Sequence, residues 1–439
     1  MLTQLRCMLL CLVALSSYDA IAAQPWQEVN LLDAGLVNEA GEVVDVSGNT
    51  QTDEAGNPLV PNCALTDLNI GEGFKFFYQP GKTDELVIFH TGGGACWENN
   101  TCGSALNPGG EATYSPVMVS SAQMLNYARG IFDTTAGTNN PYAEASKLYI
   151  PYCTGDIGWG NRDAHYVNPF NPASTYTVHH RGYANIRAVG EWMKRLYRKT
   201  PLPQKVLVSG ASAGGYAAIG SLLPEVAKVI DPQRSKISVV IDSSNAVVNN
   251  RFVNDAGEAW GIEATLPEHI LKALEGDVIG LGSRFYLNST KRYPDVLFGQ
   301  YQNNFDIVQG QFLNIMKHID EPNLWSDPEK VQESLAEWSY RMNLNTQLTA
   351  LLTRQYRFYT AAGFQHVILE YEPQIQNGWC SDVFATENTA NSLKQYQLPF
   401  YEWSKDLFKH KDKIWWGSDW LNASCGVDCL GGGPTFCPS

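Results

Sequence analysis

The stretch VLVSGASAGGYAAIGS, residues 206–221, decides the fold that we expect for this chain. An apolar, β-branched run leads into G-A-S-A-G, and a segment rich in alanine and leucine follows as far as Pro224. When a strand enters a G-x-S-x-G turn and a helix leaves it, the turn lifts the serine hydroxyl clear of the sheet edge. Short glycine-rich matches also arise by chance, so the alternative is that Ser212 is only a small residue in a tight turn. The flanking strand and helix signals favour a catalytic serine.

Four short apolar runs predict buried parallel strands, because each is rich in β-branched or aromatic residues and ends in a polar residue or glycine. They lie at residues 85–90, 147–153, 205–210 and 236–242. Between the second and third runs, Ile186, Val189 and Met193 recur at helical spacing within residues 181–199 and mark one apolar face. This alternation predicts an α/β-hydrolase-like fold, with a mainly parallel central sheet flanked by helices.

Length, composition and charge narrow the class of protein. The chain has 439 residues, of which 44% are hydrophobic and 17% are charged, so it can bury a large core as a globular protein. Its formal net charge is −14, from 31 basic and 45 acidic side chains, which argues against a nucleic-acid partner. We expect residues 23–439 to form a single elaborated catalytic domain that acts as a monomer.

The first 22 residues predict a removable export signal. Arg6 precedes an apolar run, and the small residues Ala20 and Ala22 stand at cleavage spacing. Cys11 lacks the small preceding residue of a lipid-anchored bacterial form, so we interpret it as part of the signal. No other apolar run approaches the ~20 residues that a membrane span needs. The sequence therefore predicts a secreted or periplasmic protein without a membrane span.

The remaining cysteines predict disulfide bridges. Ten cysteines less Cys7 and Cys11 leave eight, an even number that indicates bridges in an oxidising compartment, although 105 pairings are open on arithmetic alone. We expect a disulfide-rich tail at residues 415–439. Zinc binding is the alternative for Cys425, Cys429 and Cys437, but their spacing is unlike that of zinc knuckles and no histidine is near. We expect neither a metal nor an organic cofactor.

A catalytic serine needs a base, and the base needs an acid that holds its tautomer. In α/β-hydrolases the chain order is serine, acid, histidine, with the last two on loops after later strands. Strand-like runs downstream of Ser212 lead into Asp306 and His366, which we predict as acid and base. The alternatives are an Asx turn for Asp306 and a packed loop residue for His366. Asp242 also ends a strand, but it comes too early in the chain, and we expect it to hydrogen-bond nearby loops.

The oxyanion of an acyl-transfer reaction needs at least two preorganised N–H donors. The stretch IFHTGGGACW, residues 88–97, follows the first predicted strand, and its glycines allow a close backbone approach. Gly92, Gly93 and Gly94 are candidates for one side of the oxyanion hole, and Ala213, next to the serine, is the candidate for the other. A phosphate-cradling loop is the alternative, but the lysine and the serine or threonine of a P-loop are missing.

An ordered set of six segments is similar to a known family. In this order they resemble the pectin acetylesterase and Notum family of secreted serine carboxylesterases, over roughly residues 63–369. The resemblance implies that Ser212 is the nucleophile, Asp306 the orienting acid and His366 the base. It also implies that Gly93, Gly94 and Ala213 make the oxyanion hole. The segments are HTGGGACW (90–97), IPYCTGDIGWGN (150–161), HHRGYANI (179–186), GASAGG (210–215), NNFDIVQ (303–309) and GFQHVIL (363–369).

The same resemblance implies a set of disulfide pairs. It pairs Cys63 with Cys153 and Cys96 with Cys102. Two further bridges then remain for the other four cysteines, which are Cys380, Cys425, Cys429 and Cys437.

The resemblance implies an O-acetylated polysaccharide as the substrate. Trp97, Asp156 and Trp159 stand near the expected acyl or sugar pocket, and we take them as candidate substrate-binding residues, with a structural turn as the alternative for Asp156. Residues 327–352 read as a helix long enough to form part of a cap over the site. Two other functions stay open: a lipid or polyester carboxylesterase with the same triad, and a secreted glycan-binding protein whose triad is inactive.

Overall fold

The computed structural model describes residues 24–107, 110–135, 140–361, 363–370, 400–409 and 422–424. The predicted signal peptide, residues 1–22, lies outside the described residues. So do Cys380, Cys425, Cys429 and Cys437, and with them nearly all of the tail predicted at residues 415–439.

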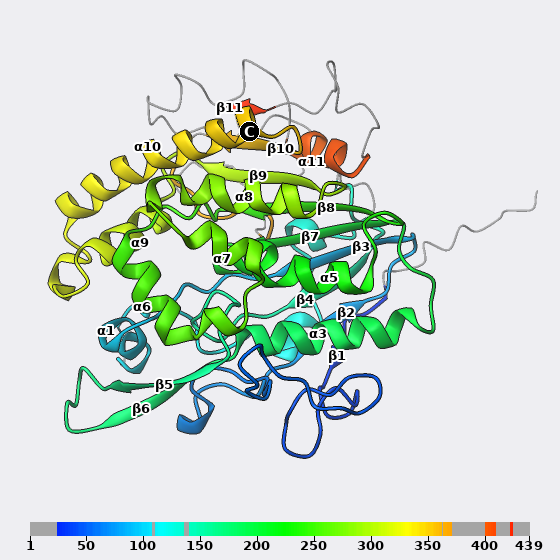
Figure 1. Cartoon of the computed structure of the whole chain (residues 1–439), viewed down its shortest axis with the longest axis horizontal. Helices are drawn as coiled ribbons and strands as arrows, with labels where there is room; N and C mark the ends of the chain where they lie inside the picture. Colours follow the sequence, from blue (N-terminus) through cyan, green and yellow to red (C-terminus); the bar gives the residue numbers. More distant parts are fainter. Residues whose placement is uncertain are drawn as a thin grey trace, which may run out of the picture.

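A nine-stranded sheet runs through the centre of the molecule in the order β1-β2-β4-β3-β7-β8-β9-β10-β11 (Figure 1). From β4 to β11 all neighbouring strands pair in parallel, whereas β1 with β2 and β2 with β4 pair antiparallel. The prediction of a mainly parallel sheet is confirmed. The strands are β1 (Gln27–Val29), β2 (Phe76–Gln79), β3 (Glu85–His90), β4 (Ser146–Ile150), β7 (Lys205–Ala211), β8 (Lys236–Asp242), β9 (Leu297–Asn303), β10 (Tyr356–Ala361) and β11 (Ala423–Ser424), with β5 (Arg162–Val167) and β6 (Thr175–His180) forming a separate antiparallel pair.

The four predicted strands correspond to β3, β4, β7 and β8. Three of them match their predicted bounds to within one residue. The exception is β4, which ends at Ile150 rather than at Cys153. Pro151 follows directly, and because proline has no backbone N–H it cannot continue the hydrogen-bond ladder.

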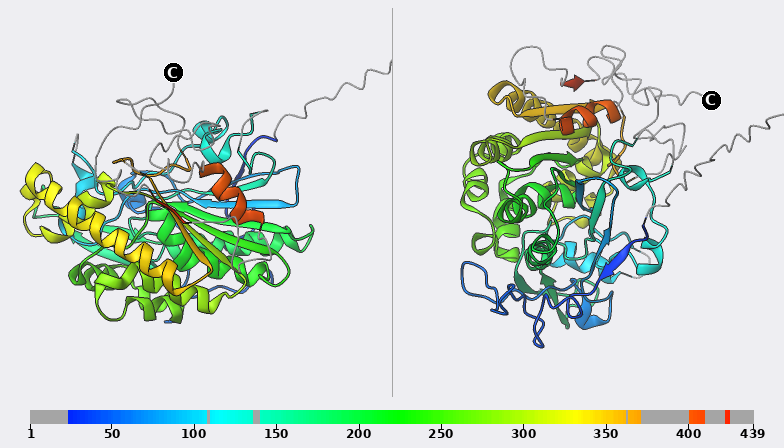
Figure 2. Two further views of the ribbon diagram at one scale, coloured as in Figure 1. Left: turned by 90° about the horizontal axis from the view of Figure 1, so that it is seen from above. Right: turned by 90° about the vertical axis from the view of Figure 1, so that its right-hand side faces the viewer.

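Successive side chains of each strand enter two different cores, as the two-residue period of a strand requires. In β3, Leu86 and Ile88 pack into the core shared with helix α3, whereas Val87 and Phe89 pack into the core on the opposite face. Burial of each such side chain contributes about 1.5–3 kcal/mol. Figure 2 (left) shows the two layers, with α11 on the face away from α3, α5 and α8.

Helices cover both faces of this sheet. The predicted helix at 181–199 is α3, whose Ile186, Val189 and Met193 are fully buried. Helix α9, which follows the carboxyl end of β9, lies on the left of Figure 1. The helices are α1 (Asn99–Gly103), α2 (Ser121–Met124), α3 (Gly182–Tyr197), α4 (Ala213–Ala217), α5 (Leu223–Val229), α6 (Asn250–Trp260), α7 (Glu268–Leu274), α8 (Leu281–Arg292), α9 (Ile307–Lys317), α10 (Pro328–Leu352) and α11 (Phe400–Lys409).

The helical path after the serine turn continues beyond Pro224. The short helix α4 passes into one π-helical turn, Ala218–Leu222, and then into α5. Pro224 stands in the first turn of α5, where its missing N–H and fixed φ are tolerated. The proline therefore marks a change of helical type and does not end the helix.

Two disulfides lie in the described part of the chain. Cys63 joins Cys153 with a Cα–Cα distance of 5.0 Å, and this bridge ties the N-terminal segment to the loop after β4. Cys96 joins Cys102 with a Cα–Cα distance of 4.8 Å and fixes the glycine loop to α1. Both pairs are the ones that the family resemblance implies.

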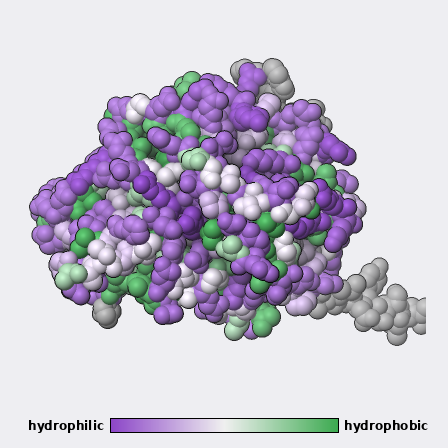
Figure 3. All heavy atoms as spheres, turned by 60° about the horizontal axis from the view of Figure 1, so that its bottom comes forward, coloured by the Kyte–Doolittle hydropathy of each residue, from purple (hydrophilic) through white to green (hydrophobic). Residues whose placement is uncertain are grey.

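The face shown in Figure 3 is mostly hydrophilic, and its apolar side chains are scattered in small patches. Acidic side chains outnumber basic ones over the chain as a whole. Within the described ranges, no helix combines the length and the apolar character that crossing a membrane would need.

Candidate active site

The backbone turns sharply at Ser212, between the end of β7 and the start of α4. The φ of Ser212 is 52° and its ψ is −124°, a combination that a residue with a side chain rarely adopts. Backbone strain of this kind persists only where the surrounding structure enforces it, and it clusters at functional sites. The turn has the strand-turn-helix form of a nucleophile elbow.

The two glycines of the G-x-S-x-G motif are required by close packing. A Cβ atom at Gly210 would lie 2.1 Å from the carbonyl oxygen of Gly214, and one at Gly214 would lie 2.0 Å from that of His90. Both distances are far inside van der Waals contact, so any side chain would force the turn open. A chance match would carry no such requirement, and the packing therefore favours a built elbow over a loop that merely contains small residues.

Asp306 and His366 come together because the loops after β9 and β10 remain paired beyond the ends of the strands. The N–H groups of Asn304, Phe305 and Ile307 donate to carbonyl oxygens in residues 361–364 at 2.8–3.1 Å. As a result, Nδ1 of His366 lies 2.9 Å from Oδ1 and 2.8 Å from Oδ2 of Asp306. An ionised carboxylate only accepts, so Nδ1 carries the proton and Nε2 is left with its lone pair.

Other contacts hold the Asp306 carboxylate in place. Oδ1 accepts the backbone N–H of Gln309 at 3.0 Å, which caps α9, and Oδ2 accepts from Nε2 of Gln302 at 2.9 Å. Asp306 has no exposed surface. Burial acts to lower the pKa of His366, but the adjacent Asp306 carboxylate outweighs it, and the pKa of His366 is raised above 6.5.

Asp242 ends β8 and joins the serine turn to the histidine loop. Its carbonyl oxygen accepts the N–H of Ser212 at 2.8 Å. Its Oδ2 accepts the N–H groups of Ile368 and Leu369 at 2.7 and 2.8 Å. Burial raises the pKa of Asp242 to about 6. The side chain therefore bonds nearby loop backbone, while Asp306 faces the imidazole directly.

The glycine loop after β3 passes directly against the serine. A Cβ atom at Gly92 would lie 2.8 Å from the Cβ of Ser212, so only glycine allows this approach. Gly94 has a φ of 72°, and its carbonyl oxygen accepts from the hydroxyl of Tyr152 at 2.8 Å. In the part of the chain that the structure describes, the N–H groups of Gly93, Gly94 and Ala213 have no acceptor. These N–H groups are free to bind an oxyanion.

Ser212 opens into a mostly apolar cavity of about 70 Å³. Its walls come from the glycine loop, from α4 and from the helices α6, α8 and α9. No residue of α10 lines it: α10 packs against α9 and α8, with Trp338 and Met342 in a core cluster with Leu313 of α9, and the cap expected from residues 327–352 stays a prediction. The residues that line the cavity beside Ser212 include Gly94, Ala213, Trp159, Tyr216, Phe252, Trp260, Phe285, Phe312 and Met316.

The three candidate substrate-binding residues have different surroundings. Trp159 lines the cavity, and its indole N–H donates to the carbonyl of Tyr216 at 3.0 Å. Trp97 does not line it: the ring is buried and packs edge-on against Phe252 at 4.8 Å. Asp156 has no exposed surface, and it accepts from Thr154, Gly158, Gly160 and Gly182 at 2.6–3.1 Å. Asp156 organises a turn, which is the alternative considered for it, and neither Asp156 nor Trp97 lines this cavity.

Sequence reasoning missed several side chains around the site. Tyr152 supports Gly94, and Tyr216 bonds Gln309 at 3.2 Å beside the serine turn. Glu370 contacts the glycine loop from the far end of the histidine loop. Tyr152 and Gln309 stand inside the segments that resemble the family, but their contacts join distant parts of the chain, and residue spacing carries no signal for them.

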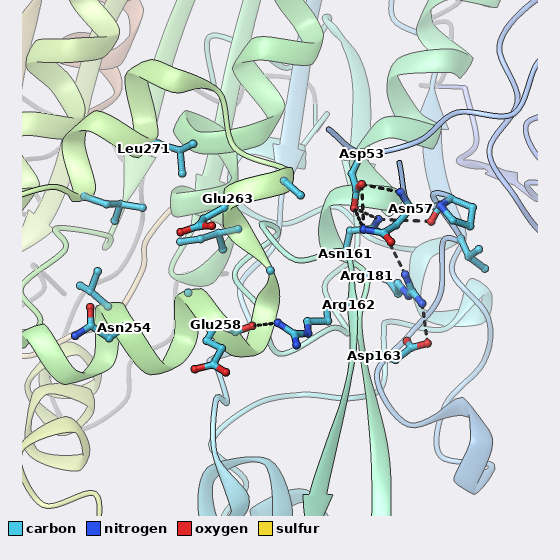
Figure 4. Close-up of a pocket in the computed structure, with 18 of the residues that line it drawn as sticks. Asp53, Asn57, Asn161, Arg162, Asp163, Arg181, Asn254, Glu258, Glu263 and Leu271 are labelled. Atoms are coloured by element: carbon cyan, nitrogen blue, oxygen red, sulfur yellow. Dashed lines mark hydrogen bonds and ion pairs between the residues drawn. The ribbon is translucent and has the colours of Figure 1, made fainter. Parts of the chain in front are cut away.

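A second, larger cavity of about 1180 Å³ adjoins the first, and four residues line both: Val253, Gly257, Ile262 and Leu274. Its walls combine polar and apolar side chains (Figure 4). The guanidinium of Arg181 pairs with Asp163 at 2.8 Å and with Asn161 at 3.0 Å. Arg162 donates to the carbonyl of Glu258 at 2.8 Å. The other ionisable lining residues are acidic: Asp53, Glu258, Glu263 and Glu275.

One group of possible metal ligands occurs among the residues that the structure describes. The ligand atoms of Cys96, Cys102 and His180 lie within 4.8 Å of one another. Both sulfurs are joined in a disulfide, so no thiolate is available, and one imidazole alone does not make a zinc site.

The comparisons with known proteins show the family and the fold of the chain. Residues 72–416 match the Pectinacetylesterase family. The chain belongs to this family. As a pectinacetylesterase-family member, it is a carboxylic ester hydrolase. No curated protein matches it significantly.

Solved structures of Notum share the fold. Two crystal forms of the Wnt deacylase Notum from Drosophila each align with a TM-score of 0.51 and 17% sequence identity. The alignments cover 81% and 82% of this chain and 92% and 96% of the Notum chains. The pectinacetylesterase-family chain therefore has a Notum-like α/β-hydrolase fold.

Proposed function

We propose that this chain is a secreted serine carboxylesterase that removes O-acetyl groups from a polysaccharide, with Ser212 as the nucleophile, His366 as the base and Asp306 as the orienting acid. The observation that carries the proposal is the pairing of His366 with the buried Asp306, together with a serine held at positive φ in the turn after β7. Residues 1–22 would direct export and then be removed, and the two disulfides and the family fit an oxidising compartment.

The proposed reaction is acyl transfer through an acyl-enzyme. Nε2 of His366 takes the proton of Ser212 as its Oγ attacks the ester carbonyl, and Asp306 stabilises the imidazolium. The N–H groups of Ala213 and of the glycine loop bind the oxyanion. Collapse expels the alcohol, which takes the proton from His366, and a water molecule activated in the same way releases the acid and frees the serine.

The size of the cavity at Ser212 supports a short acyl group. About 70 Å³ is well below the ~300–1,000 Å³ of pockets that hold drug-sized ligands. The apolar walls suit the methyl group of an acetyl ester, and a long fatty acyl chain would have to push the walls apart. Because the apolar lining extends over most of the cavity wall, we retain a second candidate function, a carboxylesterase for longer acyl esters with the same triad.

The charge of the adjoining cavity supports a neutral glycan over polygalacturonate as the alcohol part. Arg181 is paired with Asp163, Arg162 donates to a backbone carbonyl, and the acidic side chains of the lining outnumber the two arginines. A galacturonate carboxylate would therefore meet a wall with an excess of negative charge. Hydroxyl groups, by contrast, can donate to the carboxylates and amides of the wall.

An active-serine phosphonate and a series of acyl esters test the proposal. We expect the phosphonate to label Ser212 in the wild-type protein and not in Ser212→Ala, and we expect hydrolysis to fall on the order of a million-fold in Ser212→Ala. Rates should be highest for acetyl and fall with chain length. A folded Ser212→Ala protein with a tenth of wild-type activity would remove Ser212 from the mechanism. An unlabelled, inactive wild-type protein would favour the non-catalytic glycan-binding function, and a preference for long chains the second candidate.

A further inference from the structure

Glu370, the last residue of the histidine loop, bonds the loop that carries the oxyanion donors. The hydroxyl of Thr91 donates to its carboxylate, at 2.7 Å from Oε1 and 2.9 Å from Oε2. The backbone N–H of Gly92 acts to lower the pKa of the same carboxyl. The hydroxyl of Tyr127 donates to Oε2 at 3.0 Å. The carboxylate therefore binds Thr91, the residue from which the loop leads through Gly92 into Gly93 and Gly94.

The sheet itself cannot make this connection. The oxyanion loop follows β3 and the histidine loop follows β10, and three strands, β7, β8 and β9, lie between them. The two halves of the site are 279 residues apart in sequence at Thr91 and Glu370. A side chain has to span the gap if the oxyanion donors and the base are to keep one relative position.

The histidine loop is already anchored at its other residues. Asp242 accepts the N–H groups of Ile368 and Leu369, and the hydroxyl oxygen of Ser243 accepts that of Val367 at 3.0 Å. The oxyanion loop would thus be held by Glu370 against a loop whose own position is fixed relative to Ser212.

Glu370 itself is placed away from the substrate. It does not line the cavity at Ser212, and it is partly buried beside Tyr127 and Tyr149. Burial and, to a smaller extent, the charge of the Asp242 carboxylate raise the pKa of Glu370 to about 7. The hydrogen bonds from Thr91 and Tyr127 act in the opposite direction. Two carboxylates that repel each other disfavour folding when both are ionised, and groups with such perturbed pKa values cluster at functional sites.

We propose that Glu370 is a positioning residue that holds Thr91 and Gly92, and through them the oxyanion donors Gly93 and Gly94, in register with the histidine loop. The proposal rests on the proposed function, because it assigns those donors to the oxyanion. Its effect should fall on the transition state, where charge develops on the carbonyl oxygen, and only weakly on substrate binding.

The first test compares Glu370→Gln with Thr91→Val and with the double variant, on a small acetate ester. Glutamine presents an N–H₂ group where the carboxylate accepted a hydrogen bond, so at least one loop contact is lost. Loss of a whole oxyanion donor costs about 10²–10³ in kcat, and we expect misplacement to lower kcat by roughly 10- to 100-fold, with KM within about threefold. The double variant should be no slower than the slower single one, because both changes break one link.

Matched controls separate this role from a loss of stability. Glu144→Gln, at an exposed carboxylate 4.0 Å from Lys82, should leave kcat and KM unchanged. A boronic acid that forms a tetrahedral adduct at Ser212 should lose affinity in Glu370→Gln in proportion to kcat. If kcat stays at the wild-type value in both Glu370→Gln and Thr91→Val, or if only KM changes, Glu370 does not position the oxyanion loop.

A measurement without turnover separates the failure of this proposal from failure of the proposed function. Hydrogen exchange of residues 91–94 and 367–370 in the Ser212→Ala protein should speed up at least several-fold when Glu370→Gln is added, with the rest of the sheet unchanged. Unchanged exchange in both segments would overturn the link even if the enzyme proves active. If the wild-type protein proves inactive and Glu370→Gln still speeds up exchange in both segments, the link is supported and the esterase function is rejected.

Discussion

Both carboxylate oxygens of Asp306 lie within hydrogen-bonding distance of Nδ1 of His366, at 2.9 and 2.8 Å. The pairing exists because the loops after β9 and β10 continue the strand register for several residues. It leaves Nε2 as the nitrogen available to take a proton, and the competing acid, Asp242, bonds backbone N–H groups of the same loop.

Replacing each of the two aspartates by asparagine in a separate variant distinguishes their roles. In Asp306→Asn an amide can donate to Nδ1, which favours the wrong tautomer, and we expect kcat to fall roughly ten-thousand-fold with substrate binding little changed. Steady-state kinetics on a small acetate ester measure this. Asp242→Asn leaves the contact between His366 and Asp306 in place, so we expect the change mainly in the melting temperature. The larger rate loss at Asp242 would show that the acid has been misassigned.

The acid limb of the pH–rate profile reports His366. Because its pKa is raised above 6.5 and the base must be neutral, kcat/KM should rise with pH through an apparent pKa above 6.5. The check is kcat/KM for an uncharged ester between pH 5 and about 9, with protein stability followed alongside. A limb centred well below 6.5 would mean that Asp306 does not face an imidazolium in the free enzyme.

Because the Asp242 carboxyl is buried, its contribution to the free energy of unfolding should fall as the pH rises, whereas that of a salt-bridged carboxylate would increase. Its folded pKa of about 6 lies above the value of 3.8 for an unperturbed group, so the folded state holds the proton more tightly. Stability from this group is complete below about pH 4 and is lost as the pH rises to about 6, by on the order of 3 kcal/mol. Urea unfolding at several pH values, with Asp242→Asn as the comparison, tests this: equal slopes for both proteins in that window would refute it.

The sequence predicts those parts of the fold and of the site that are encoded by residues close together in the chain. The elbow at Ser212, the strands β3, β7 and β8, and the helix α3 follow from runs of adjacent residues and from their periodicity. The sequence left Asp156 open between a cleft and a turn, because a carboxylate in a glycine-rich segment has the same local sequence whether it faces a cleft or its own backbone. Glu370 was missed because its partner Thr91 lies across three strands, a relationship that no spacing in the sequence records.

The two disulfides should differ in what they contribute to stability. If a bridge acts by restricting the unfolded chain, the Cys63–Cys153 bridge, which spans 90 residues, contributes about 4–5 kcal/mol, and the Cys96–Cys102 bridge, which spans 6, contributes about 2 kcal/mol. Replacing each pair by alanine should therefore lower the free energy of unfolding more for Cys63 and Cys153. Equal losses, or a free thiol at any of the four cysteines in the unreduced mature protein, would contradict this account.

The last prediction concerns charge and substrate. A chain at −14 that meets acetylated polygalacturonate brings two negative objects together, and their repulsion extends about 30 Å at ~0.01 M salt but only about 8 Å at physiological strength. Acidic side chains outnumber Arg162 and Arg181 in the adjoining cavity, and Arg181 is paired with Asp163, so the cavity offers no net local attraction to offset that repulsion. We therefore expect kcat/KM for the polyanion to rise several-fold between those salt levels, because electrostatic steering acts on encounter rather than on the chemical step. Acetylated xylan and a small neutral acetate ester, as matched uncharged controls, should stay flat. Fastest hydrolysis of the polyanion at low salt would require a basic surface elsewhere at the site and would favour a pectin substrate after all.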